Sequence, residues 1–349
     1  MYFCIRSHIS VPKKTALMPN MKSTNSIFLS IVIPCYNVAE YLPDTLHSLC
    51  QLSDAVDCEF IFVDDGSTDG TTSILQDFAQ TDRRAVFIRQ PNAGVSAARN
   101  AALQEAKGQY ILPVDGDDRL LPDAISTIRQ AIQEDDLLIA PVQILEHGRC
   151  IQAPLPFPEG TYTPYTLFRN CKVFPTGPKL VYKADIIRTH SLRFNEATHC
   201  GEVFAFTCTF LSHCQTIKVS HHCFYQYVMR KTSAIHAPNF QKDVTVLHIV
   251  DDVTKVTDAS IRALPSYNAT LFRMCTTFTY NKYAKEGLLD NPALTVIKQV
   301  VQHKGLRHCS MRLVRSIGYY GKDRFMALYI MLTGLWGYRL LGRVFRFRK

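Results

Sequence analysis

The sequence predicts an α/β fold in which a mainly parallel sheet is flanked by helices, followed by a C-terminal helical extension. Short strand patterns alternate with helical patterns of 10–15 residues between residues 27 and 140, as in consecutive βαβ units. The 349 residues are 47% hydrophobic and 20% charged, which is enough apolar material for a sizeable core. No apolar run reaches the 18 residues of a conventional membrane-spanning helix.

The first strand is expected at residues 27–33 (IFLSIVI), a buried-strand pattern that Pro34 follows. Further strands are expected at residues 59–63 (EFIFV), 85–89, 110–114 (YILPV) and 137–140. Helices are expected between them at residues 38–52, 71–80, 94–106 and 122–134, the last with a Pro acceptable in its first turn. Residues 150–178 are rich in Pro and aromatic residues and are predicted to be loop. Mixed structure is expected over 179–230, and helices from about 240.

Polar residues follow four of the expected strands at the point where each one ends. They are Asn37, Asp64 with Asp65, Asn92, and the run from Asp115 to Asp118. Ligands of parallel α/β sheets bind outside the carboxyl ends of the strands, so these residues are expected to share one site. Taken separately, the VDDGSTDG segment is also good turn chemistry on a turn outside the core, and Asp115–Asp118 could simply begin a helix.

Clustered carboxylates repel one another unless a cation neutralises them, and an Asp-x-Asp pair suits Mg²⁺ or Mn²⁺ completed by substrate phosphates. Arg99 lies one helical segment before the Asp run and could supply donors to a phosphate. The sequence has no G-x-x-x-x-G-K-[ST] segment, and no G-x-G-x-x-G follows the first strand. A P-loop protein and a dinucleotide dehydrogenase are therefore not expected.

Positive charge is concentrated in the C-terminal tail. The formal net charge is +9, and residues 298–349 hold 12 of the 39 Lys and Arg residues but one of the 30 acidic residues. Within this tail, residues 325–338 are uncharged but too short to span a bilayer, and alternating Arg and apolar residues follow them. We expect an interfacial helix on an anionic membrane surface rather than a nucleic-acid groove. The alternatives are an amphipathic helix packed on the protein's own core and an oligomer contact.

Twelve cysteines are spread along the chain without a C-x-x-C pair. We interpret them as reduced thiols, mostly small core residues. Histidine and cysteine also gather between His199 and Cys223, but their spacing matches no zinc knuckle, so packed thiols and surface imidazoles are favoured there.

Four motifs together resemble those of family 2 glycosyltransferases of the GT-A fold. They are SIVIPCYN at 30–37, FVDDGSTDGT at 62–71, NAGVSAARN at 92–100 and LPVDGDD at 112–118. A weaker resemblance continues through Pro178-Lys179-Leu180, residues 192–206 and residues 225–235. The resemblance implies a bacterial-type enzyme that moves a sugar from a nucleotide donor, often a UDP-sugar, to a glycan or lipid-linked acceptor in cell-surface polysaccharide synthesis.

The resemblance also implies roles for individual residues. Pro34 and Asn37 would shape the nucleoside pocket, Asp64 or Asp65 would bind the base or ribose, and Arg99 would contact the nucleotide. Asp115 and Asp117 would be the metal-binding pair, with Mn²⁺ or Mg²⁺ as cofactor, and Asp118 would adjoin them at the nucleotide-sugar.

The chain departs from the family at its catalytic base. The family has Glu-Asp where this chain has Glu202-Val203, and the Asp of that pair is the base. Glu202 is therefore the candidate base here. The mechanism implied is a single displacement that inverts the anomeric carbon.

Three classes of function are weighed. The first is an inverting, metal-dependent glycosyltransferase, and the second is a non-catalytic nucleotide-sugar binder that has lost its base. The third, a phosphoryl-transfer enzyme with an Asp nucleophile, is disfavoured because the first strand ends without a carboxylate.

The predicted organisation has a disordered leader at 1–26 and a glycosyltransferase domain at 27–235, divided into a nucleotide-binding half (27–140) and an acceptor half (141–235). A helical extension follows at 236–349. The expected location is the cytoplasm, at the inner face of the plasma membrane.

Overall fold

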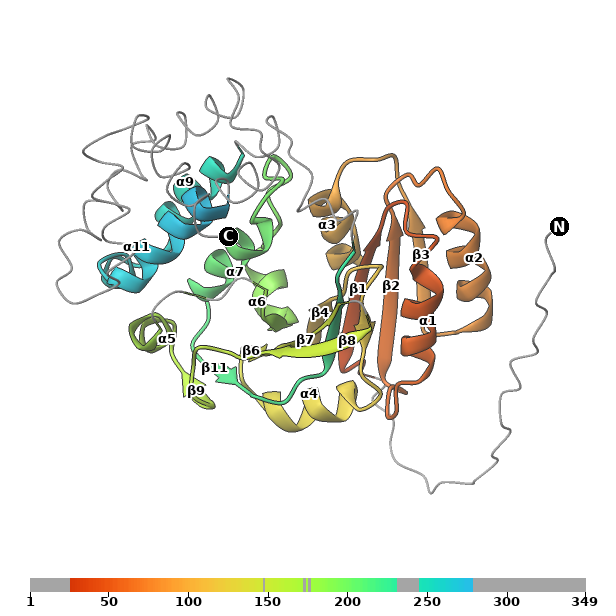
Figure 1. The fold of residues 1–349 in the computed structure, drawn as a ribbon, viewed down its shortest axis with the longest axis horizontal. Coiled ribbons are helices and arrows are strands. Elements are labelled where there is room, and N and C mark those ends of the chain that lie inside the picture. The colour runs from red at the N-terminus through yellow and green to blue at the C-terminus, as the bar shows by residue number, and fades with distance from the viewer. Residues whose placement is uncertain (1–25, 147, 172–173, 175–176, 231–244, 279–349) are drawn as a thin grey trace.

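The computed structural model describes residues 26–278, apart from 147, 172–173, 175–176 and 231–244. The predicted leader and the basic tail lie almost wholly outside the described residues. Figure 1 shows an α/β arrangement in which strands run through the centre and helices lie on both sides.

The strands form two sheets. An eight-stranded sheet has the order β3-β2-β1-β4-β10-β6-β11-β9, and a four-stranded sheet has the order β5-β12-β7-β8. Their bounds are β1 Leu29–Cys35, β2 Cys58–Asp64, β3 Ala85–Arg89, β4 Tyr110–Pro113, β5 Arg119–Leu120, β6 Leu137–Ala140, β7 Val142–Glu146, β8 Arg149–Ala153, β9 Gly160–Tyr162, β10 Lys179–Lys183, β11 Ile217–Val219 and β12 Tyr225–Val228.

The helices within the described residues flank the large sheet or follow it. They are α1 Leu42–Cys50, α2 Thr71–Thr81, α3 Val95–Glu105, α4 Ala124–Ile132, α5 Pro164–Asn170, α6 Ala184–Thr189, α7 Glu202–Leu211, α9 Val246–Val256, α10 Ala259–Arg262, α11 Pro265–Phe272 and a π-helical turn at Arg273–Phe278. The strands and helices predicted between residues 27 and 140 are confirmed, with ends that differ by a few residues.

The large sheet is mixed but mainly parallel. β1 pairs in parallel with β2 and β4, β2 with β3, and β6 with β11. β10 is inserted between β4 and β6 and runs antiparallel to both, and β9 is antiparallel to β11. Because β10 is reversed, its first residue lies at the edge where β4 ends.

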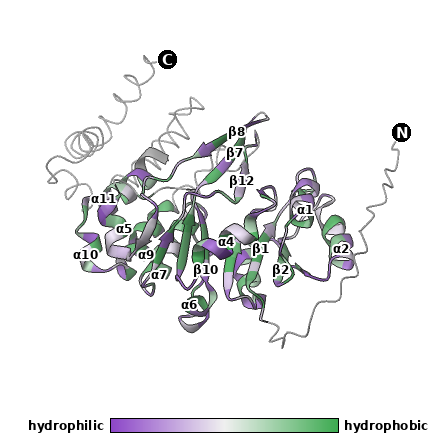
Figure 2. Ribbon diagram, turned by 90° about the horizontal axis from the view of Figure 1, so that it is seen from below, coloured by the Kyte–Doolittle hydropathy of each residue, from purple (hydrophilic) through white to green (hydrophobic). Residues whose placement is uncertain are grey.

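Strand residues alternate between two cores, one on each face of the sheet. Val32 and Ile61 face a core that also includes residues of α3, α5, α6, α7, α9 and α11. Ile31 and Phe60, one position away on the same strands, face a core formed with α1, α2 and α4. Apolar residues therefore concentrate in the central strands, as the hydropathy colours of Figure 2 show.

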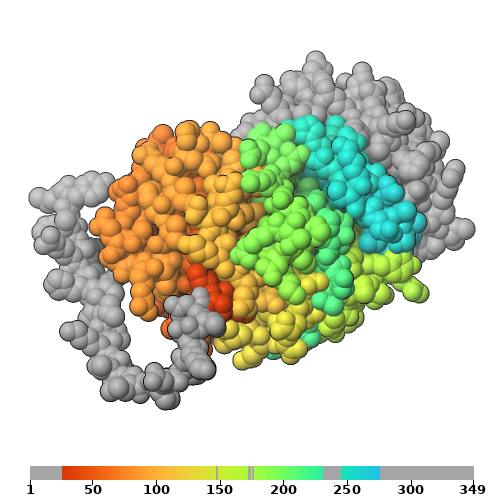
Figure 3. All heavy atoms as spheres, turned by 180° about the vertical axis from the view of Figure 1, so that it is seen from behind, coloured from red at the N-terminus to blue at the C-terminus, as the bar shows by residue number. Residues whose placement is uncertain are grey.

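The α9 and α11 helices share the core that also contains α3, α5, α6 and α7 rather than forming one of their own. Ile249, Val253 and Leu271 are fully buried in it. In the space-filling view of Figure 3, the segments in orange and yellow adjoin the green segments, and the cyan helices adjoin the green segments on their other side.

The prediction of loop for residues 150–178 is wrong in part. β8 ends the β7–β8 hairpin, β9 lies at the edge of the large sheet, and α5 follows. The residues of β8 are almost all exposed, so no apolar alternation marked the strand. Pro164, interpreted as a loop residue, instead begins α5, where Thr163 and Thr166 cap the first turn reciprocally.

Asp136 ties together three segments at the amino end of β6. Its Oδ1 accepts from Lys183 Nζ at 3.2 Å, and its Oδ2 accepts from the backbone N–H groups of Gln215 at 2.8 Å and Thr216 at 3.2 Å. Partial burial disfavours the ionised carboxylate, but these donors outweigh it and lower the pKa of Asp136 below its usual value.

We predict that Asp136→Asn lowers the free energy of unfolding by about 1–3 kcal/mol at neutral pH, because the amide presents N–H groups to backbone donors. The pKa of Asp136 is lower in the folded protein than in the unfolded chain, where it is about 3.9, so the ionised carboxylate stabilises the fold at pH values above the unfolded-state pKa. This stabilisation is lost as the pH falls through the folded-state pKa. Urea unfolding at pH 7 and at about pH 3 should therefore show a difference that shrinks in acid. Asp185→Asn, at an exposed surface pair, is the control; an equal loss in both variants would contradict the prediction.

Candidate active site

The carboxyl ends of β1, β2 and β4 meet at one edge of the sheet, because these strands are parallel neighbours. The segments that follow them carry the predicted polar clusters. Gly116 lies so close to the end of β1 that a Cβ there would be 2.8 Å from Cys35 Sγ and 3.2 Å from the Pro34 carbonyl oxygen. Pro34 therefore packs behind the Asp115–Asp118 segment, as expected of one shared edge.

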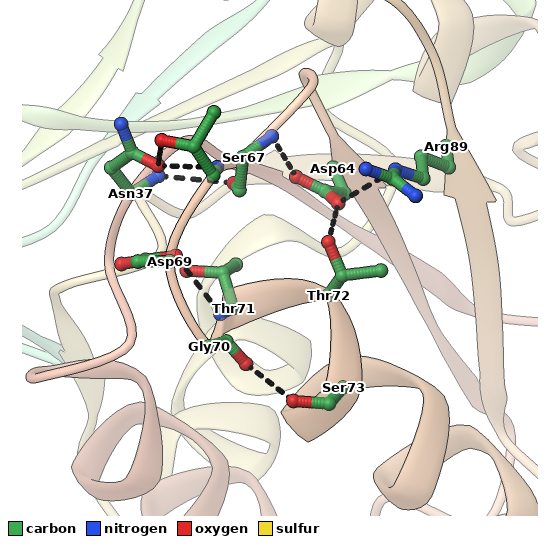
Figure 4. A network of polar contacts seen from close by, with 10 residues as sticks. Asn37, Asp64, Ser67, Asp69, Gly70, Thr71, Thr72, Ser73 and Arg89 are labelled. Atoms are coloured by element: carbon green, nitrogen blue, oxygen red, sulfur yellow. Dashed lines mark hydrogen bonds and ion pairs between the residues drawn. The ribbon is translucent and has the colours of Figure 1, made fainter.

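Asp64 is fully buried and stabilises the loop that follows β2 (Figure 4). Its Oδ1 accepts from the Ser67 N–H at 2.9 Å, and its Oδ2 accepts from Thr72 Oγ1 at 2.5 Å and lies 3.5 Å from Arg89 Nε. Asn37, at the end of β1, has a positive φ of 50° and accepts from the Thr68 N–H at 2.8 Å. The loops after β1 and β2 are thus bound to each other.

Asp65 makes the equivalent link to the loop that precedes α3. Its Oδ1 accepts from Gln90 Nε2 at 2.7 Å and from the Ala93 N–H at 2.9 Å, and its Oδ2 accepts from the Gly94 N–H at 2.8 Å. The expectation that Asp64 and Asp65 lie on a turn outside the core is wrong, since both are buried and hydrogen-bonded. Their contact with a nucleoside stays a prediction.

Arg99 is the centre of a second network. This arginine of α3 donates from Nη2 to Asp115 Oδ1 at 2.9 Å and from Nη1 to Glu202 Oε1 at 2.8 Å. Its side chain is 7% exposed. Burial works against its charge, but the two carboxylates outweigh burial and raise the pKa of Arg99 above its usual value.

The same ion pair acts on Asp115 in the opposite direction. Desolvation disfavours ionised Asp115, but the charges of Arg99 and Lys179 outweigh it and lower the pKa of the carboxyl. Arg99 thus brings together two candidate residues that lie far apart in the sequence, Asp115 and Glu202.

Asp117 forms an ion pair with Arg230, whose guanidinium also lies over the Tyr41 ring at 4.7 Å. Burial and the charge of Asp115 raise the pKa of Asp117, while Arg230 works against that shift. Arg230 lies within residues 225–235, which resemble the family, and its pairing with Asp117 does not follow from the sequence pattern.

Asp118 connects the end of β4 to β12. Its Oδ2 accepts from the Tyr225 hydroxyl, and its Oδ1 accepts from the Val228 N–H at 2.8 Å. Burial, followed by the charges of Asp115 and Asp117, raises the pKa of Asp118 to about 7. Asp118 is 1% exposed and both of its oxygens accept hydrogen bonds within the protein, and its contact with a nucleotide-sugar stays a prediction.

Lys179 is the residue of this edge that sequence reasoning missed. It is the first residue of the reversed strand β10, and its Nζ lies 3.4 Å from the centroid of the Tyr225 ring, a cation–π contact. Burial lowers the pKa of Lys179 to about 8, against the opposing effect of Asp115 and Asp118. The Pro178-Lys179-Leu180 resemblance was the available signal.

Glu202 is the first residue of α7, and its side chain is 15% exposed. The helix begins after Gly201, which has a φ of 78° and lies where a Cβ would be 2.4 Å from Ile249 of α9. Val203, the next residue, packs against the apolar core. Of these two residues, Glu202 is therefore the one whose side chain reaches the polar edge.

The donor set at this edge suits a hard divalent cation. Carboxylate oxygens are the ligands that Mg²⁺ and Mn²⁺ prefer, and the Asp115 side chain is 45% exposed beside Asp117. Within the described part of the chain, no three His, Cys, Asp or Glu residues are placed to hold a metal together, in the 199–223 segment or elsewhere. Asp117 and Asp115 are the side chains of this edge that could hold such an ion.

The chain was compared with known proteins. The family model described as glycosyl transferase family 2 matches residues 30–169. The putative teichuronic acid biosynthesis glycosyltransferase TuaG of Bacillus subtilis is 41% identical over 98 residues, which cover 28% of this chain and 38% of TuaG. The uncharacterized glycosyltransferase YibD of Escherichia coli is 27% identical over 234 residues, 61% of this chain and 64% of YibD.

A third relative, the poly(ribitol-phosphate) beta-glucosyltransferase of Bacillus spizizenii, is 30% identical over 208 residues, 58% of this chain and 32% of that protein. The chain thus spans less than two thirds of the length of each of these three curated relatives.

Solved structures show the same fold. Residues 1–349 of S. aureus TarS in complex with UDP-GlcNAc align with a TM-score of 0.69 at 18% identity, covering 91% of each chain. The mannosyltransferase PcManGT of Pyrobaculum calidifontis, solved with GDP-Man and Mn²⁺, aligns with a TM-score of 0.53 at 14% identity, covering 90% of this chain and 86% of that one. The predicted GT-A-type fold is confirmed by these structures, and residues 30–169 of the chain match the glycosyl transferase family 2 model.

Proposed function

We propose that this chain transfers a sugar from a nucleotide-sugar, specifically a UDP-sugar, to a hydroxyl of a glycan or lipid-linked acceptor in cell-surface polymer synthesis, with inversion at the anomeric carbon. The observation that carries the proposal is the Asp115–Arg99–Glu202 network beside Asp117 at the carboxyl edge of the sheet. The match of residues 30–169 to the family model supports it, as do relatives named for teichuronic acid and poly(ribitol-phosphate) synthesis and a structural neighbour solved with UDP-GlcNAc.

Each residue of the site has a distinct part in the proposed reaction. Glu202 would take the proton of the acceptor hydroxyl as that oxygen attacks the anomeric carbon, while Arg99 holds the Glu202 carboxylate through its other oxygen. Attack opposite the departing diphosphate in one displacement inverts the carbon. In this proposal, the positive charges of Lys179 and Arg99 stabilise the negative charge that develops on the departing diphosphate. A Mn²⁺ or Mg²⁺ held by Asp117 and Asp115 would supply Lewis-acid stabilisation of the leaving group.

One observation favours a second candidate, a protein that binds a nucleotide-sugar without transferring it. Val203 packs against the core at the position where the family carries its base, so the chain has no carboxylate there. Turnover of donor into a glycosylated product distinguishes the two, since binding alone satisfies the second candidate.

The domain limits and the cellular location are also proposals. We propose a glycosyltransferase domain at 27–235 and an extension at 236–349 whose basic tail binds the inner face of the plasma membrane. The apolar and basic pattern of the tail supports this, although the tail lies outside the described residues. No helix within the described residues has the length and apolar character that membrane crossing requires.

We expect Asp117→Ala to reduce transfer at least about 100-fold, because it removes the residue best placed to hold the cation against the diphosphate. Chelation of divalent metal in the wild type should have the same effect, reversed by Mn²⁺ or Mg²⁺. The measurement is release of UDP from a panel of UDP-sugars with acceptor present. Asp123→Ala is the matched control, since Asp123 is exposed and its side chain caps no N–H group. Full activity in excess chelator would refute the metal role.

Glu202→Gln should lower kcat at least about 100-fold with donor affinity nearly unchanged. The amide oxygen can still accept from Arg99, so the geometry is kept while the basic carboxylate is lost. Steady-state kinetics is the measurement, and Glu196→Gln is the control because Glu196 is exposed and accepts a hydrogen bond from Asn100. Near wild-type kcat in Glu202→Gln, with loss in Glu196→Gln or Asp118→Asn, would place the base elsewhere.

Replacing Arg339, Arg343, Arg346 and Arg348 by Gln should reduce binding to vesicles that contain anionic lipid at least about tenfold, since each basic residue near such a surface contributes about 1 kcal/mol. Co-sedimentation measures the bound fraction, and raised salt should weaken wild-type binding in the same direction. Undiminished binding by the variant would show that the tail is not the membrane contact.

A further inference from the structure

We propose that Arg230 is an internal cation that occupies the carboxylate of Asp117 in the donor-free protein, and that it must leave this carboxylate before a divalent cation binds there. The inference rests on the proposed function, in which Asp117 is a metal ligand. It adds a residue that determines when that ligand is available.

Contacts on two sides hold Arg230. Its Nη2 is ion-paired with Asp117 Oδ2, and its guanidinium carbon lies 4.7 Å from the centroid of the Tyr41 ring, on the segment that leads into α1. The exposed fractions of the Arg230 and Asp117 side chains are 21% and 11%. An ion pair between partly buried groups, with an aromatic face beneath the guanidinium, is a specific contact rather than a loose surface pair.

The other carboxylates of the edge are already matched to different partners. Asp115 is paired with Arg99, and Asp118 accepts from the neutral Tyr225 hydroxyl and the Val228 N–H. Asp117 is paired with Arg230, which lies two residues after the end of β12. The protein thus supplies its own positive charge at the position where the family resemblance implies a metal.

A guanidinium and a divalent cation compete for Asp117 in two ways. Both need the lone pairs of the same carboxylate, and two positive charges within a few ångström repel each other. Stabilising the Arg230–Asp117 pair therefore weakens the apparent affinity for the cation, because only molecules in which Asp117 is released can bind it. The backbone before Arg230 is held, because the Val228 N–H donates to Asp118 Oδ1 at 2.8 Å and the Met229 N–H donates to the Leu145 carbonyl oxygen at 3.0 Å. The proposed release of Asp117 is therefore a movement of the Arg230 side chain.

The test is a titration of the full-length protein with Mn²⁺ alone, with free Mn²⁺ followed by electron paramagnetic resonance. Arg230→Ala should bind Mn²⁺ at least about tenfold more tightly than the wild type, because the competing charge-assisted contact is gone. Tyr41→Leu keeps the apolar volume but removes the cation–π contact, so it should shift the affinity in the same direction by a smaller factor. Adding Asp117→Asn to the Arg230→Ala variant or to the Tyr41→Leu variant should abolish the gain in Mn²⁺ affinity.

Arg129→Ala is the charge-matched control. It removes one positive charge from α4, where Arg129 pairs with Asp57 at the opposite edge of the sheet, so the Mn²⁺ affinity should not change. A gain equal to that of Arg230→Ala would reveal a non-specific effect of net charge and overturn the proposal.

Two further outcomes would overturn it. Equal or weaker Mn²⁺ binding by both Arg230→Ala and Tyr41→Leu would mean that Arg230 does not compete with the cation. Absence of Mn²⁺ binding in every variant, also when the titration is repeated with UDP present, would mean that there is no cation site for Arg230 to occupy. Donor turnover by the wild type, measured separately, decides the proposed function, so the two can fail independently.

Discussion

Mutual repulsion among the carboxylates at one sheet edge is the constraint on which the rest of the structure depends. Asp115, Asp117 and Asp118 follow a single strand within four positions, and Glu202 lies next to them in space. Groups from distant segments balance this negative charge or donate hydrogen bonds to it. They are Arg99 from α3, Lys179 from the reversed strand β10, Arg230 beyond β12, and the neutral Tyr225 hydroxyl. Without them, the edge would lose its shape or take up protons.

The sequence could predict the features that depend on neighbouring residues, but not those that depend on which strands pair in the sheet. The strands and helices up to residue 140 were recoverable because apolar runs and turn residues alternate over short windows. The shared edge followed, since parallel strands end together. The position of Lys179 could not be derived in this way, because it depends on the insertion of β10 between β4 and β6. The pairing of Arg230 with Asp117 likewise depends on β12 joining β5 and β7 in the second sheet.

The errors are equally physical. The turn that contains Asp64 and Asp65 was expected to lie outside the core. Two other loops pack against it, so it is buried and its carboxylates accept hydrogen bonds from backbone N–H groups. The hairpin strand β8 escaped notice because solvent covers both of its faces. Nor did sequence periodicity indicate that Glu202 would share one arginine with Asp115, since that contact needs α3 and the start of α7 side by side.

The contact between Gly201 and Ile249 has a consequence for protein engineering. Glu202 begins its helix directly after a glycine whose missing side chain leaves room for α9, and Met274 lies against the same glycine. A chimera that exchanged everything after residue 235 for the corresponding part of a relative would therefore replace the surface on which the proposed base is mounted. Swaps intended to change acceptor choice while preserving catalysis should keep α9 to α11 with their own parent and cross over beyond residue 278.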